Sequence, residues 1–225
     1  MKNIIDRLAE GNRLYLAAVR PAGDVSKKAR LKTAQEGQFP YAVIVTCSDA
    51  RVIPEAIFSA GIGDLFVIRV AGNVIDKHQL GSIEYAAAHL GCRMVVVLGH
   101  TGCGAVAAAL SEERDKSAET SNDSSDNKNN IAEKNEVNYI HYLTDEIIKA
   151  AGGETDPDQV TCLNAVNSVH VVRKALGSTK TAAQYVEETH ALMAAPTEEK
   201  CELKDVTVVA AIYHIDDGRV EFLED

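Results

Sequence analysis

The chain has 225 residues, 46% of them hydrophobic, with a formal net charge of −10 and an isoelectric point near 5.2. This length and hydrophobic content favour a single domain with a sizeable core. The acidic balance, with no basic patch in the sequence, excludes a typical nucleic-acid-binding protein and disfavours binding to anionic membrane surfaces. The first residues lack the apolar segment of a signal peptide, and every apolar run is too short to span a bilayer. We therefore expect a cytoplasmic protein without a membrane partner.

Hydrophobic periodicity predicts the elements in chain order. An amphipathic helix is expected over 3–20, followed by a polar segment over 25–38 that contains a short helix. The predicted strands are short and almost entirely apolar, as in a sheet that is buried on both faces. They cover 41–46, 65–70, 94–98 and 206–213. Helices are predicted to begin at Pro54 and just after Cys103, and to cover 79–90, 135–151, 157–175 and 179–194.

The alternation of strands and helices predicts an α/β fold with a mainly parallel central sheet flanked by helices. Asp217-Gly218 separates two strand-like runs, which indicates a C-terminal hairpin at an edge of the sheet. We expect one domain over 1–225, with a helical arm over 1–35 and a polar insertion loop over 111–135. The arm has no evident partner in the sequence, so it either packs on its own core or reaches a second subunit.

Chemically useful side chains follow two of these strands. Cys47 comes directly after the strand at 41–46, and His100 and Cys103 follow the strand at 94–98. Ligands in open α/β sheets bind at the carboxyl ends of strands. Thiolate and imidazole are preferred zinc ligands, and three protein ligands leave the fourth position open, as in catalytic sites. The sequence therefore predicts a zinc site formed by Cys47, His100 and Cys103.

Asp49 and Arg51 follow Cys47 closely, and their role decides the kind of site. A bidentate pair with Arg51 would hold the Asp49 carboxylate off the metal and ionised. In the alternative, Asp49 is the fourth ligand of a closed structural zinc. Plainer interpretations are a surface ion pair for Asp49 and Arg51, and buried thiols beside a hydrogen-bonded histidine for the three ligands.

The order Cys47-Ser48-Asp49-Ala50-Arg51-Val52 followed by His100-Thr101-Gly102-Cys103-Gly104 resembles the β-class carbonic anhydrases. The likeness is dense from about Gln38 to Leu110. It implies the reversible hydration of carbon dioxide to bicarbonate and a proton by a zinc-bound hydroxide. In this resemblance Cys47, His100 and Cys103 bind Zn²⁺, and Asp49 and Arg51 orient the hydroxide.

The same resemblance implies further contacts with substrate and with a second subunit. Gln38 matches a position that binds substrate by hydrogen bonds, and Phe66 and Tyr85 match positions that line the carbon dioxide pocket. From the residues alone, Gln38 is an ordinary surface residue, and Phe66 and Tyr85 are core aromatics. The resemblance also implies a homodimer or a higher homo-oligomer, with the site at the subunit interface and the N-terminal arm around the partner.

One departure from the family pattern bears on the metal. The chain has no Trp, and Ile44 lies where members with an accessory bicarbonate site carry one. We therefore expect the open arrangement, with water as the fourth zinc ligand. Alternative functions are a carbonyl sulfide or carbon disulfide hydrolase on the same scaffold, and a non-catalytic zinc- and bicarbonate-binding protein. A thiol redox protein is a weaker alternative, because Cys47 and Cys103 do not form a Cys-x-x-Cys pair.

Overall fold

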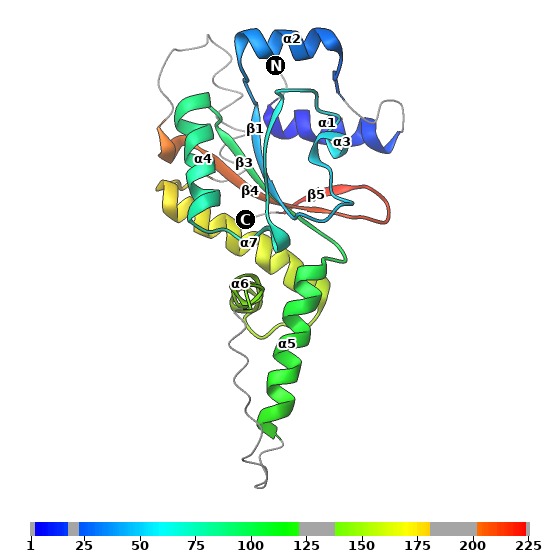
Figure 1. The fold of residues 1–225 in the computed structure, drawn as a ribbon, viewed down its shortest axis with the longest axis vertical. Coiled ribbons are helices and arrows are strands. Elements are labelled where there is room, and N and C mark those ends of the chain that lie inside the picture. Colours follow the sequence, from blue (N-terminus) through cyan, green and yellow to red (C-terminus); the bar gives the residue numbers. More distant parts are fainter. Residues whose placement is uncertain (1–2, 18–22, 122–137, 181–201, 224–225) are drawn as a thin grey trace.

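The computed structural model describes residues 3–17, 23–121, 138–180 and 202–223. Its centre is a five-stranded sheet in the order β2-β1-β3-β4-β5 (Figure 1). The strands are β1 (Ala42–Thr46), β2 (Leu65–Arg69), β3 (Met94–His100), β4 (Thr207–Tyr213) and β5 (Val220–Phe222). The neighbours among β1 to β4 are parallel, and β5 is antiparallel to β4 at the edge. The predicted α/β class, the mainly parallel sheet and the edge hairpin are confirmed.

Seven α-helices are described around this sheet. They are α1 (Ile4–Leu16), α2 (Lys27–Glu36), α3 (Pro54–Ile57), α4 (Lys77–Leu90), α5 (Gly104–Ser121), α6 (His141–Ala151) and α7 (Pro157–Leu176). Two short 3₁₀ turns, η1 (Ala71–Asn73) and η2 (Leu203–Asp205), precede α4 and β4. The helix predicted over 179–194 falls almost entirely outside the described residues. Within the described residues, no helix combines the length and the apolar character that a membrane crossing needs.

The side chains of the sheet alternate between two apolar layers. One layer contains Val43, Val95 and Val208 and packs against α4 and α7, whereas the other contains Ile44 and Val96 and packs against α1 and α3. Figure 1 shows these helix pairs on opposite sides of the sheet. Because both faces are covered, β1, β3 and β4 are buried at every position, as their apolar sequences predicted.

Helix α1 packs on the core of its own chain. Leu8 is fully buried in the α3 side of the core, and the buried Asn12 side chain donates to the carbonyls of Ile57 and Gly218. Its Oδ1 accepts a hydrogen bond from the Val220 N–H. Helix α1 is therefore tied to the edge hairpin of its own chain.

Close packing of α1 predicts a large effect for a single methyl group. A β-carbon at Gly11 would lie 1.9 Å from the Phe58 carbonyl oxygen. Gly11→Ala is therefore expected to lower the free energy of unfolding by about 1–3 kcal/mol or more, since backbone must move. Gly81→Ala in α4, where a β-carbon has open space, is the matched control and should raise stability by up to about 1 kcal/mol. Urea unfolding measures both, and equal effects would contradict this packing.

The predicted polar loop over 111–135 is wrong in its first part. Residues 111–121 continue α5, and residues 122–135 lie outside the described residues. Contacts with α6 favour the longer helix, because Glu112 accepts a hydrogen bond of 2.8 Å from Thr144 and lies 3.3 Å from His141. Lys116 and Asp145 form a further ion pair between the two helices at 3.8 Å. Residues 111–121 are therefore helical despite their polar composition, because α6 packs against them.

Candidate metal centre

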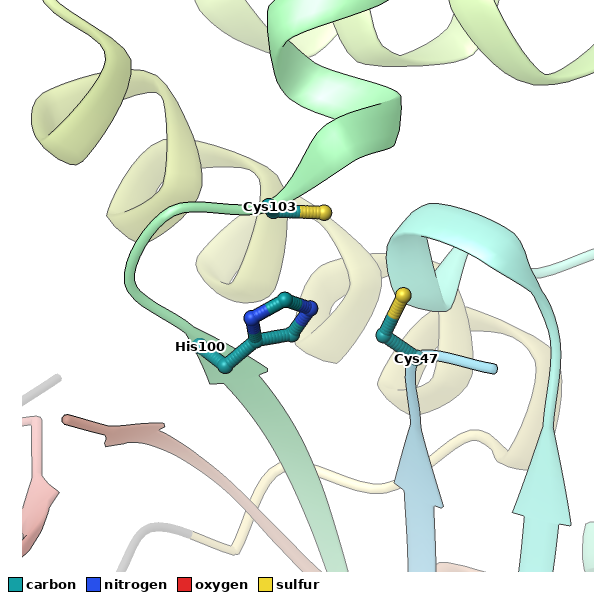
Figure 2. Close-up of side chains that lie close together, drawn as sticks. All are labelled: Cys47, His100 and Cys103. Atoms are coloured by element: carbon teal, nitrogen blue, oxygen red, sulfur yellow. The ribbon is translucent and has the colours of Figure 1, made fainter. Parts of the chain in front are cut away.

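Three side chains meet at the carboxyl ends of β1 and β3. Cys47 follows β1 directly, His100 is the last residue of β3, and Cys103 precedes α5 (Figure 2). Figure 2 shows the two sulfur atoms and the imidazole ring turned toward a common point. Their candidate ligand atoms all lie within 4.8 Å of one another, and the three residues are almost completely buried. The strand-end placement that the sequence predicted is confirmed for these residues.

Strand β3 places His100 more rigidly than the sequence indicated. The strand was predicted to end at residue 98, but Gly99 and His100 continue it and pair with Ile212 and Tyr213 of β4. Gly99 suits this position because a β-carbon there would lie 3.0 Å from the Ile212 side chain. The imidazole is therefore carried by a paired strand and not by a free loop.

The imidazole of His100 has one nitrogen engaged and one available. Its Nδ1 lies 3.0 Å from the Thr101 carbonyl oxygen, which fixes Nδ1 as the protonated donor. Its Nε2 is fully buried and has no hydrogen-bond partner among the described residues. A buried nitrogen with a free lone pair is costly unless something binds it. A metal ion bound at Nε2 would satisfy this atom.

The two thiols also favour a cation between them. The Cys103 thiol, together with His100 and the Gly72 N–H, lowers the pKa of Cys47, and the neighbouring Cys47 sulfur raises the pKa of Cys103. Two sulfur atoms this close carry one negative charge more readily than two. Zn²⁺ would allow both to be thiolates, because it offsets their repulsion. The residues present thus fit zinc in donor type, number and burial.

Asp49 lies beside this cluster but is held by Arg51. The guanidinium donates from Nε to Oδ1 at 3.0 Å and from Nη2 to Oδ2 at 2.7 Å, which is a bidentate pair. The Arg51 backbone N–H also donates to Oδ1 at 2.9 Å. Asp49 Oδ2 is 4.0 Å from His100 Nε2, so the carboxylate is near the metal position without belonging to the ligand cluster. The Arg51 guanidinium holds the pKa of Asp49 well below its usual range, so Asp49 is ionised.

Gln38, Phe66 and Tyr85 lie elsewhere in the same chain. Phe66 pairs with Val43, four residues before Cys47, which places it about 13 Å back along the strands. Its ring lies 6.2 Å from that of Tyr85, which is half-exposed on α4. Gln38 precedes β1 and is exposed, at the opposite end of that strand from Cys47. The structure therefore brings five of the eight predicted site residues together and leaves these three apart.

Two groups at the site were not among the predicted site residues. The Gly72 N–H donates to Cys47 Sγ at 3.3 Å, and Gly72 adopts a positive φ of 67° in η1. Arg69, the last residue of β2, donates to the backbone carbonyls of Cys47 and Asp49. The position of Arg69 in the sequence was a signal for its place at the site. An arginine that ends an apolar strand beside β1 lies at the same edge of the sheet as Cys47.

Comparison with known proteins gives the family. A family model described as carbonic anhydrase matches residues 42–220, most of the chain. The chain belongs to the carbonic anhydrase family. It is 49% identical over 110 residues to carbonic anhydrase 2 of Mycobacterium tuberculosis, a match that covers 48% of this chain and 52% of that protein. It is 46% identical over 106 residues to a carbonic anhydrase of Mycolicibacterium smegmatis, covering 46% and 50%.

The chain spans about half the length of the curated relatives it matches. Solved structures share the fold more broadly. A tetrameric β-carbonic anhydrase from Sordaria macrospora matches with a TM-score of 0.55 and 21% identity, over 88% of this chain and 87% of that one. A Coccomyxa β-carbonic anhydrase matches with a TM-score of 0.54 and 19% identity, over 98% and 81%. The fold is thus that of the β-class, and the Cys47, His100 and Cys103 cluster matches the β-class zinc site.

Proposed function

We propose that this protein catalyses the zinc-dependent reversible hydration of carbon dioxide to bicarbonate and a proton. The observation that carries the proposal is the position of Asp49, which Arg51 holds in a bidentate pair beside three buried zinc ligands. Three protein ligands with a carboxylate held nearby leave one position for a water molecule. A closed structural zinc would instead need Asp49 as its fourth ligand.

Each residue of the proposed site has a separable task. Cys47 Sγ, Cys103 Sγ and His100 Nε2 would hold the metal, and Thr101 fixes the imidazole through its carbonyl oxygen. Bound there, zinc supplies Lewis acidity that lowers the pKa of a coordinated water, the effect for which carbonic anhydrases are the standard example.

Asp49 supplies a hydrogen-bond acceptor at the open side of the cluster. Because Arg51 occupies its oxygens from one side and keeps it ionised, the carboxylate accepts a hydrogen bond from the attacking water and turns a lone pair of that water toward carbon dioxide. Burial of the three ligands limits the approach of bulk water to the same small space. These tasks suit attack on a small linear substrate.

Gln38, Phe66 and Tyr85 enter the proposal through a homodimer. They lie too far from Cys47 to serve the site of their own chain. A two-fold dimer presents the same surface of each subunit to the other, so these side chains of one subunit are proposed to reach the site of its partner. Phe39, next to Gln38, is 73% exposed, and an interface at this end of β1 would bury it.

A complementation experiment tests this shared site. Gln38→Ala keeps the zinc ligands and Cys103→Ser keeps Gln38, and each variant alone is expected to be nearly inactive. Mixed dimers should contain one intact site each, so co-refolding equal amounts is expected to recover about a quarter of wild-type turnover. A mixture no more active than the average of the two separate variants would contradict a site shared between subunits.

A stopped-flow comparison of carbon dioxide hydration with carbonyl sulfide hydrolysis tests the reaction itself. Zinc-loaded protein at pH 8.5 is expected to accelerate hydration far above the buffer rate and to release sulfide slowly or not at all. Sulfide release without faster hydration would make the protein a carbonyl sulfide hydrolase. Inactivity of the zinc-loaded protein toward both substrates would favour a binding protein.

A further inference from the structure

The side chain of Arg69 bridges two backbone carbonyls of the active-site loop. Its Nη2 donates to the Asp49 carbonyl oxygen at 2.7 Å, and its Nε donates to the Cys47 carbonyl oxygen at 3.3 Å. We propose that Arg69 is a positioning residue that clamps the backbone between the zinc ligand Cys47 and the carboxylate-bearing Asp49. The proposal rests on the proposed function for its catalytic consequence, but the clamp itself has a readout in metal binding.

The register of the sheet explains why Arg69 reaches this loop. Arg69 is the last residue of β2 and pairs with Thr46, the residue before Cys47. The Val70 N–H then donates to the Thr46 carbonyl at 3.1 Å, so the two strands remain joined beside the loop. A long side chain at the end of β2 therefore spans the first three residues that leave β1.

Most of the other hydrogen bonds of this loop are local. The Val52 N–H donates to the Asp49 carbonyl at 3.0 Å, and the Arg51 N–H donates to the Asp49 side chain. These bonds shape the turn over 49–52 but do not join it to the sheet. Arg51 Nη2 donates to the Gly102 carbonyl at 3.2 Å and so joins the turn to the loop after β3. Arg69 joins the turn to β2, and the Gly72 N–H separately holds the Cys47 sulfur. The Arg69 guanidinium thus holds the backbone of the zinc ligand and the turn together at the end of β2.

The chemistry of the guanidinium matters for this task. Its planar fork of N–H groups meets two separate oxygen acceptors at fixed angles, whereas a lysine ammonium is a compact point charge. Arg69 is exposed, so its removal takes little from the hydrophobic core. We expect loss of the fork to loosen the Cys47 backbone and to misalign Asp49 against the cluster, with the fold intact.

Zinc release to a chromogenic chelator tests the clamp, using full-length protein loaded with one zinc per chain. In Arg69→Met, release is expected to be about 10- to 100-fold faster than in the wild type, the usual effect of losing a residue that supports metal ligands. The visible spectrum of the cobalt(II)-substituted protein should shift as well, because the donor geometry changes. Arg114→Met is the matched control, since Arg114 also donates to a backbone carbonyl, that of Leu110, on α5. It should release zinc like the wild type.

Arg69→Lys separates the fork from the charge. The clamp predicts that Lys restores at most part of the slow release, because it cannot hold both carbonyls in the same geometry. Wild-type release and an unshifted cobalt spectrum in Arg69→Met would overturn the proposal, and so would full recovery by Arg69→Lys. If the wild-type protein does not hydrate carbon dioxide, the proposed function fails, whereas the release rates still decide whether Arg69 clamps the loop.

Discussion

Cys103→Ser is expected to lower the affinity for zinc by orders of magnitude. Serine keeps the approximate shape of the side chain, but its hydroxyl is not deprotonated at neutral pH and is a poorer zinc ligand than thiolate. The loss should be large because Cys103 is one of three ligands whose atoms lie within 4.8 Å of one another. Metal analysis after dialysis and competition with a chelator would measure it.

Cys162→Ser is the control for the loss of a thiol. Cys162 is a partly buried cysteine on α7, outside the metal cluster, so its replacement should leave the zinc content at one per chain. Full zinc retention in Cys103→Ser would remove Cys103 from the ligand set. Equal zinc loss in both variants would point to unfolding instead, and thermal denaturation monitored by circular dichroism would detect that.

Asp49→Ala is expected to reduce turnover about 100-fold or more while zinc stays bound. The substitution removes the acceptor that orients the attacking water, but none of the three ligands. Asp49→Asn keeps the size of the side chain and loses its charge. Its turnover should also be low, because an amide has no second anionic oxygen to accept the other hydrogen bond from Arg51.

Asp145→Ala is the matched control, since Asp145 is an exposed aspartate on α6 that is paired with Lys116. It should leave both turnover and zinc content unchanged. Loss of zinc from Asp49→Ala would show that Asp49 is a ligand. Unchanged turnover with zinc retained would remove Asp49 from the mechanism.

The sequence predicted the sheet and the ligand set well because both depend on local signals. Apolar β-branched runs identify buried strands, and a cysteine or histidine at the end of such a run is placed by the strand itself. Cys47 and His100 therefore converge in the structure although they lie 53 positions apart in the sequence. The pairing of Asp49 with Arg51 was also predictable, since only one residue lies between them.

The boundaries that were missed depend on side-chain contacts and on strand pairing. Helix α4 begins at Lys77 instead of residue 79, because Asp76 and Gln79 form a capping box. Strand β3 continues to His100 because β4 offers a partner for each added residue. The second half of α5 is helical where a polar loop was predicted, supported by Glu112 against α6. Hydrophobic periodicity alone does not reveal any of these three contacts.

The distance of three predicted site residues from the metal cluster of their own chain has a different explanation. Gln38, Phe66 and Tyr85 follow from a family resemblance, and a resemblance does not say which subunit of an assembly supplies a residue. Arg69 was overlooked because it contacts backbone carbonyls, and its position at the end of an apolar strand is a weak signal by itself. Backbone contacts of this kind are visible only once the register of β1 and β2 is known.

The central claim is that Arg51 holds Asp49 off the metal and leaves one zinc position open. A crystal structure of the zinc-loaded protein at neutral pH, with the metal located by its anomalous signal, tests this most directly. We predict Zn–S distances of about 2.3 Å to Cys47 and Cys103, a Zn–N distance of about 2.0–2.1 Å to His100 Nε2, and a non-protein fourth ligand. Asp49 should remain paired with Arg51. An Asp49 oxygen bonded to zinc, with the Arg51 pair broken, would contradict the account.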